Sequence, residues 1–228
     1  MIWFTSDTHA YHKNITKGVS TWDDKDISCR DFPTLEEMTD DVVNSINKYV
    51  MEDDELYHDG DVSFGGIENI WNFRKRIKCK NFHLILGNHD DHIKKNKILP
   101  NCHWVTKVVK IDGCDTIQND YIEDATFIDP LNPVRAQDLF TSVDKYLELK
   151  IEKKTIILSH YAFEEWYEMD LTGSYHLHGH NHHRFDDKEL NTKYRRMDIG
   201  IDWEEFRPYS WDEIKEIMKN RKIKKHNS

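Results

Sequence analysis

The feature that most constrains this chain is an apolar run at its N-terminus that passes directly into an Asp-x-His pair. Residues 2–5 are apolar, aromatic or β-branched, and Asp7 and His9 follow at once. A run of this kind is typical of a buried β-strand. In open α/β sheets, ligands bind outside the carboxyl ends of the strands. We therefore expect a carboxylate and an imidazole at a sheet edge where a ligand can bind.

Four later segments repeat this arrangement of a strand-like run followed by polar side chains. The runs end near residues 58, 86, 158 and 178. Over all five segments, the side chains able to bind a metal are Asp7, His9, Asp61, Asn88, His160, His180 and His182. The alternating His176 and His178 are expected to be core residues and not ligands. The pattern predicts one composite site built from five strand ends.

These side chains define the kind of ion that such a site would hold. Carboxylate, amide oxygen and imidazole suit Mn, Fe, Zn or Ni, and the lack of thiolates argues against a structural zinc site. The seven ligands are too many for one ion, but they suit two ions that share a bridging carboxylate, roughly 3.5–4 Å apart. We expect two divalent metal ions, with Mn as the first choice and Fe, Zn or Ni as the alternatives.

Composition narrows the class of protein. With 228 residues, of which 38% are hydrophobic, the chain can bury one sizeable core, so we expect a single domain over residues 1–228. It has neither an apolar stretch of about 18 residues nor a signal-peptide pattern, and its four cysteines lack CxxC spacing, so a cytoplasmic location is expected. The net charge of −10 argues against a stable nucleic-acid complex.

Periodicity predicts alternating strands and helices in the first half of the chain. Residues 35–50 have helical spacing, and Thr34 and Glu37 form a capping box. The segment 112–150 carries nine acidic against three basic residues and two prolines. We interpret it as an acidic insertion, part loop and part helix around 136–149. Both a lid over the site and a remote surface elaboration are compatible with this composition.

The candidate ligands also carry a resemblance to a known family. The motifs Asp7-x-His9, Gly60-Asp61, Gly87-Asn88-His89-Asp90, Ser159-His160 and Gly179-His180-x-His182 resemble the five ordered motifs of calcineurin-like metallophosphoesterases. His12-Lys13-Asn14 and Arg30-Asp31-Phe32-Pro33 resemble a short bacterial and phage subgroup. The resemblance implies an α/β fold, a four-layer αββα sandwich of two mixed sheets flanked by helices.

The resemblance further implies a role for each motif residue. One ion would be held by Asp7, His9 and His182, the second by Asn88, His160 and His180, with Asp61 bridging the two. A metal-held hydroxide would attack phosphorus in line, and His89 would protonate the leaving oxygen as the general acid. Asp59 or Asp90 would orient His89. His12 and Arg30 are the candidates for contact with the substrate phosphate, and surface hydrogen bonding or a structural ion pair is the alternative.

The expected substrate is a small phosphorylated molecule, with a nucleotide-type phosphodiester ahead of a monoester. A protein phosphatase would carry an arginine shortly after Gly60-Asp61, and residues 62–66 contain none. A nuclease on DNA or RNA is the main alternative, opposed by the acidic charge. A non-catalytic scaffold with this fold would have lost ligands that are all present here. A metal-sequestering protein would be expected to carry a polyhistidine tract.

Overall fold

The first sheet carries the N-terminal motifs. The computed structural model describes residues 1–24, 27–111, 114–123, 133–183 and 188–225, and this sheet has five strands in the spatial order β12-β1-β2-β3-β7. The strands span Ile2–Thr5 (β1), Glu55–His58 (β2), Asn81–Ile85 (β3), Ser142–Asp144 (β7) and Tyr209–Ser210 (β12). β1, β2, β3 and β7 are parallel, and β12 pairs antiparallel with β1. The carboxyl ends of four strands therefore share one edge.

The second sheet carries the later motifs and has the order β11-β10-β9-β8. Its strands span Leu147–Ile151 (β8), Lys154–Leu158 (β9), Tyr175–His178 (β10) and Arg196–Asp198 (β11). β9, β10 and β11 are parallel, whereas β8 forms an antiparallel hairpin with β9. Both large sheets are therefore mixed.

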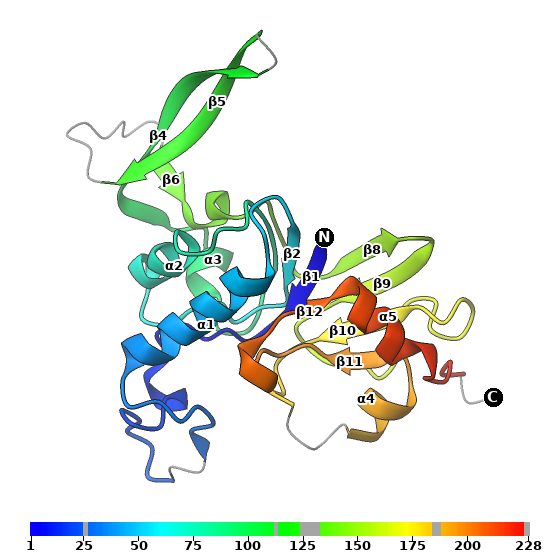
Figure 1. The fold of residues 1–228 in the computed structure, drawn as a ribbon. Helices are drawn as coiled ribbons and strands as arrows, with labels where there is room; N and C mark the ends of the chain where they lie inside the picture. Colours follow the sequence, from blue (N-terminus) through cyan, green and yellow to red (C-terminus); the bar gives the residue numbers. More distant parts are fainter. Residues whose placement is uncertain (25–26, 112–113, 124–132, 184–187, 226–228) are drawn as a thin grey trace.

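Side-chain alternation along the strands decides which layer each residue joins. Trp3 faces the core under the helices α1 (Leu35–Tyr49) and α2 (Ile67–Arg74), and its neighbour Phe4 faces the second sheet. The core between the sheets gathers Phe4, Ile85, Ile156, Leu158, Leu177 and Met197. Figure 1 shows α1 and α2 on one side of the first sheet and β8 to β11 on the other. The predicted α/β fold of two mixed sheets flanked by helices is confirmed, and a single domain stays a prediction.

The remaining helices close the edges and the outer face of the sandwich. They are α3 (Asp91–Lys94), α4 (Lys188–Lys193) and α5 (Trp211–Lys219), with short 3-10 turns at Lys13–Ile15, Ala136–Leu139 and Glu204–Phe206. Helix α1 begins as predicted, since the Thr34 hydroxyl accepts a hydrogen bond from the Glu37 backbone N–H at 3.2 Å. Among the described residues, no helix combines the length and the apolar character needed to cross a membrane.

The segment 112–150 differs from the prediction. A hairpin of β4 (Ile98–Ile111) and β5 (Cys114–Glu123) precedes β6 (Pro133–Arg135), and the strands β7 and β8 replace the expected helix around 136–149. The reason is visible in Leu147, Leu149 and Ile151, which alternate with period two and face the core between the sheets. The segment is therefore not an insertion throughout, because β7 and β8 belong to the two sheets. Residues 112–113 and 124–132 lie outside the described part.

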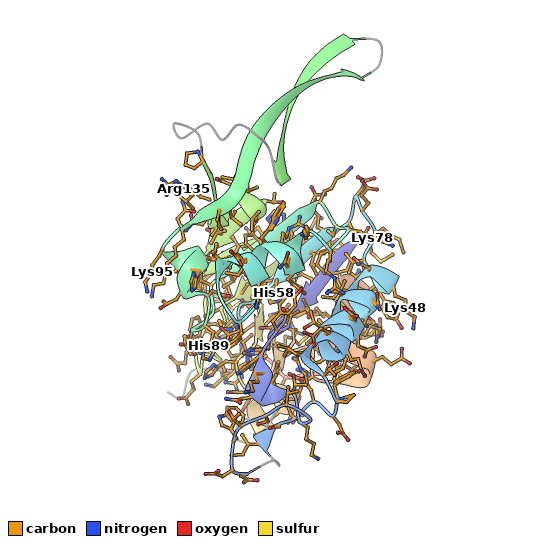
Figure 2. The ribbon with its side chains drawn as sticks, turned by 90° about the vertical axis from the view of Figure 1, so that its left-hand side faces the viewer. Lys48, His58, Lys78, His89, Lys95 and Arg135 are labelled. Atoms are coloured by element: carbon orange, nitrogen blue, oxygen red, sulfur yellow. The ribbon has the colours of Figure 1, made fainter. Side chains whose placement is uncertain are left out.

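The β4–β5 hairpin extends away from the body of the molecule (Figure 1). In Figure 2 it leaves the body near Arg135, while His89 lies at a distance from it in the same view. Replacing residues 105–120 by Asn-Gly would join the paired residues Trp104 and Tyr121 through a two-residue turn. We expect metal content and the ratio of oligonucleotide to small-diester hydrolysis to stay within about twofold of wild type. A selective rise in oligonucleotide hydrolysis would instead support the predicted lid.

Candidate metal centre

The five motifs meet at one edge of the two sheets, where the parallel strands of both sheets have their carboxyl ends. Asp7 and His9 follow β1, Asp61 follows β2, and the later motifs follow β3, β9 and β10. The backbone N–H of His180 donates to Oδ2 of Asp7 at 2.9 Å, which ties the second sheet to the first. Ligands that are 173 residues apart in sequence are thus brought into direct contact.

One cluster of donor atoms is formed by Asp7, His9 and His182. Oδ1 of Asp7 lies 3.7 Å from Nε2 of His9 and 3.8 Å from Nε2 of His182. Oδ1 of Asp7 and Nε2 of His9 are buried without a hydrogen-bond partner. Burying such atoms unpaired is costly, so their convergence fits a bound cation. Burial raises the pKa of Asp7 to about 6 and holds the pKa of His9 well below its ordinary value.

A second cluster is formed by Asp7, Asp61 and His160. Oδ2 of Asp61 lies 3.6 Å from Nε2 of His9 and 3.5 Å from Nε2 of His160, so this carboxylate stands between the two sets of donors. Nδ1 of His160 lies 2.7 Å from the Asp59 carbonyl, and its Nε2 lies 2.9 Å from Oδ1 of Asn88. A neutral imidazole donates from one nitrogen only, so only one of these two oxygens can accept a hydrogen bond from it. If Nδ1 donates its proton to the Asp59 carbonyl, Nε2 keeps a lone pair and is able to bind a metal beside Asn88.

His180 lies beside the second cluster, with its ring centroid 5.2 Å from that of His160. His180 is in none of the three groups of candidate donors found among the described residues, the third of which joins Cys29, His182 and Asp202. The structure thus brings all seven predicted ligands to one place, and the two clusters together contain five of them. Carboxylates, imidazoles and an amide oxygen form a donor set that fits two divalent ions.

The backbone of the site is strained. The left-handed conformation, with positive φ, is adopted by Asp7 (55°), His9 (45°), Asp61 (58°), His180 (70°) and His182 (49°). Such residues cost of order 1–3 kcal/mol each and cluster at functional sites. Gly87 and Gly179 allow the close packing, because a Cβ atom there would lie 2.2 Å from Oδ1 of Asp61 and 1.9 Å from Oγ of Ser6. Holding these side chains together therefore lowers the stability of the fold.

Comparison with known proteins decides the family. The sequence profile of calcineurin-like phosphoesterases matches residues 1–199. The chain belongs to the calcineurin-like phosphoesterase family. Family membership makes this phosphoesterase a metal-dependent hydrolase of phosphoric esters, and the structure supplies candidate metal-binding groups. The resemblance to a short bacterial and phage subgroup stays a prediction.

A structure comparison agrees on the fold. The crystal structure of a protein of unknown function from Aquifex aeolicus matches with a TM-score of 0.58 and 19% sequence identity, covering 96% of this chain and 99% of the other. At this identity the similarity concerns the fold alone. A comparison with curated proteins finds no match.

Arg30 is not positioned to contact a substrate phosphate in this phosphoesterase, contrary to the prediction. Its side chain is buried, with 1% exposure. Nε and Nη2 donate to the two carboxylate oxygens of Asp202 at 2.7 and 3.1 Å, and the guanidinium also donates to the backbone carbonyls of Asp7 and Thr8. All three guanidinium nitrogens thus donate hydrogen bonds inside the protein. Arg30 instead holds the strained loop after β1 in place.

Asp202 is the residue that sequence reasoning missed. Its Oδ2 lies 2.5 Å from Nδ1 of His182, so the carboxylate orients that imidazole while pairing with Arg30. Burial alone would raise the pKa of Asp202, but Arg30 and the hydrogen bond from His182 hold it well below its usual range. The only sequence feature that could have pointed to Asp202 is its position directly after the alternating, strand-like run 196–201. A carboxylate that fixes a ligating histidine raises its basicity and sets its tautomer.

Replacing Asp202 with alanine should therefore weaken metal binding by about 10–100-fold. It should also lower the free energy of unfolding, because Arg30 is left buried without its partner. Titration of metal-free protein with Mn²⁺ measures the first effect, and urea unfolding measures the second. Asp202→Asn keeps an acceptor for His182 and should retain more metal affinity than Asp202→Ala. Equal and near-native affinities in both variants would contradict the positioning role.

The predicted general acid lies at the open side of the centre. The His89 side chain is 48% exposed, and its Nε2 lies 4.0 Å from Oδ2 of Asp61. Neither predicted orienting carboxylate contacts it. The Asp90 carboxylate accepts from the backbone N–H groups of Asp61, Val62 and Gly87 at 2.8, 3.0 and 2.8 Å. The carboxylate oxygens of Asp59 are buried without a hydrogen-bond partner. The prediction that one of them orients His89 is wrong.

Three of the pockets formed by described residues border the centre. The largest of the three, about 330 Å³, is bordered by Asn88, His160, Lys94 and Lys145. A second, of about 250 Å³, lies beside His9, His12 and His182 and has the apolar walls Ile15, Trp22 and Ile27. A third, of about 270 Å³, runs along Ser63 to Gly66 beside His89. A phosphate held between the two donor clusters would have a pocket on either side.

His12 remains a candidate for substrate contact. It lines the apolar pocket and stacks on Phe64, with ring centroids 3.7 Å apart and planes inclined by 4°. Burial lowers the pKa of His12 to about 4, so its imidazole is neutral at neutral pH. A neutral His12 can donate one N–H to a phosphate oxygen but brings no charge.

Proposed function

We propose that this protein is a dinuclear-metal-dependent phosphoesterase that hydrolyses small phosphodiesters of nucleotide type. The observation that carries the proposal is the convergence of Oδ1 of Asp7 and Nε2 of His9, both buried and unpaired, with donors from His182, Asp61 and His160. In the proposal, one ion is held by Asp7, His9 and His182, the other by Asn88, His160 and His180, and Asp61 serves both.

Two divalent ions would supply an activated water and neutralise the charge of the phosphoryl oxygens. Among the chain's own groups, His89 is exposed enough to reach a bound substrate and close enough to Asp61 to face the scissile bond. Its proposed task is to hand a proton to the leaving oxygen. His12 would donate one hydrogen bond to a phosphate oxygen.

Preference for a diester is supported by the two pockets beside the clusters. A diester carries two substituents on phosphorus, and each pocket can accept one, whereas a monoester would leave one pocket empty. The apolar walls beside His9 suit a planar group such as a nucleobase. Phosphoprotein substrates are disfavoured because residues 62–66 carry no arginine.

A nuclease acting on DNA or RNA is the second candidate function. The net charge of −10 opposes long polyanions, which bind through many phosphate contacts. We also propose Mn as the native metal, given the mixed oxygen and imidazole donors. The cytoplasm remains the proposed location, since the four cysteines lack CxxC spacing and are too few for a disulfide-rich scaffold.

The experiment that tests this proposal is a substrate screen after removal of bound metal and reconstitution with Mn²⁺, Fe²⁺, Zn²⁺ or Ni²⁺. The panel contains p-nitrophenyl phosphate, bis(p-nitrophenyl) phosphate, cyclic nucleotides and an oligonucleotide. We expect metal-dependent hydrolysis in which the small diester exceeds both the monoester and the oligonucleotide in kcat/KM. A monoester that is hydrolysed best, or hydrolysis that persists in excess chelator, would contradict it.

A further inference from the structure

Two lysines border the pocket that opens beside Asn88 and His160. Lys94 comes from α3, a few residues after the Asn-His motif, and Lys145 comes from the link between β7 and β8. Both side chains are exposed. Figure 2 shows the neighbouring Lys95 on the same flank of the molecule as His89.

Parallel pairing explains why these lysines meet at the site. β3 and β7 are adjacent and parallel, with Ile85 opposite Asp144. The chain therefore leaves both strands at the same edge, and the backbone N–H of Leu86 donates to the Asp144 carbonyl at 2.7 Å. Lys145 follows β7 as Gly87 and Asn88 follow β3. The part of the acidic segment 112–150 that borders this pocket thus brings a cation to the metal centre.

The two lysines of the pocket have no close ion-pair partner among the described residues. Within the described part of the chain, neither Lys94 nor Lys145 forms an ion pair, whereas the adjacent Lys95 pairs with Asp91 at 3.0 Å. Among the described residues, no lysine or arginine lines the pocket beside His9 and His12 or the pocket along Ser63 to Gly66. In a protein of net charge −10, this pocket thus places two ammonium groups in the same wall as the candidate ligands Asn88 and His160. They favour an anion at this side of the centre and at neither of the other two.

We propose that Lys94 and Lys145 form a subsite for a second phosphate group of the substrate. The substrate class is then a phosphate ester that carries a further phosphate on the substituent lying beside Asn88 and His160. Two ammonium groups match the two negative charges of a terminal phosphate, and lysine binds phosphate as a compact point charge. This inference rests on the proposed function, because the scissile phosphate must occupy the metal centre.

The test measures binding directly by titration calorimetry, using Mn²⁺-loaded protein freed of excess metal. The ligands are alkanediol bisphosphates with three to six carbons, each compared with the alkyl monophosphate of the same length. Either phosphate of such a ligand can occupy the metal centre, and chain length adjusts the span. We expect the best bisphosphate to bind at least about tenfold more tightly than its monophosphate. This advantage should fall as NaCl is raised from 50 to 500 mM.

Matched variants distinguish binding at the subsite from a general effect of the protein's charge on anion binding. Lys94→Gln and Lys145→Gln should each lose part of the bisphosphate advantage, and the double variant should lose nearly all of it. Lys95→Gln removes the same charge one residue away and should keep the advantage. No advantage in wild type, an unchanged advantage in the double variant, or an equal loss in Lys95→Gln would each overturn the subsite. Hydrolysis of bis(p-nitrophenyl) phosphate, which carries no second phosphate, tests the proposed function separately in the wild type and in Lys95→Gln, where it should be unchanged.

Discussion

Replacement of His89 by alanine is expected to lower kcat by about 10²–10⁴ while leaving the metal content unchanged. His89 lies at the open side of the centre, where its Nε2 is 4.0 Å from the Asp61 carboxylate and its side chain is 48% exposed. This position suits proton delivery to a leaving oxygen. The side chain contributes to neither donor cluster, so its loss should not release metal.

Leaving-group dependence tests the same assignment more sharply. A nitrophenolate leaves with little need of a proton, so the loss in His89→Ala should be smallest for bis(p-nitrophenyl) phosphate. It should grow for alkyl leaving groups, which are strongly basic. His92→Ala is the matched control, because His92 lies three residues later in the wall of the Ser63–Gly66 pocket. Equal losses for good and poor leaving groups, or metal loss in His89→Ala, would argue against the general-acid role.

Asp61→Asn is expected to lower kcat/KM by more than about 10³ and to prevent binding of the full metal pair. Oδ2 of Asp61 lies between the two clusters, 3.6 Å from His9 and 3.5 Å from His160. A neutral amide group is a much weaker ligand for two cations than the anionic carboxylate oxygen that it replaces. Its remaining oxygen can still accept the hydrogen bond from the His89 backbone N–H, which is 2.8 Å long in the wild type. The loop should therefore keep its shape while the metals are lost.

Stability provides a readout of this change that is independent of activity. Saturating Mn²⁺ should stabilise the wild type by about 2.7–4.1 kcal/mol at 100 to 1,000 times the dissociation constant, and Asp61→Asn by much less. Without metal, the variant should be at least as stable as the wild type, because one buried carboxylate has been neutralised. Asp91→Asn, which changes an exposed carboxylate of α3, should behave as the wild type. A full metal-induced stabilisation of Asp61→Asn would refute the bridging position.

The local sequence determined much of this protein. Apolar runs that end in Asp, Asn or His predicted where strands end and where the candidate ligands lie. This was possible because a buried strand and the ligand residues that follow it are encoded within a few consecutive residues. The capping box at Thr34 likewise predicted the start of α1, since its hydrogen bond spans three residues. Five ordered motifs were enough to indicate the family and the α/β sandwich.

Only the tertiary structure decided what depends on distant pairing. Arg30 was predicted to contact substrate, but its partner Asp202 lies 172 residues later, and no local pattern links the two. The acidic composition of residues 112–150 suggested an insertion with a helix around 136–149. Pairing of β7 with β3 instead makes residues 142–144 part of the first sheet. The same pairing brought Lys145 to the metal centre. A buried ion pair and a sheet edge are formed by chain segments that meet in space, so composition and periodicity within either segment cannot predict them.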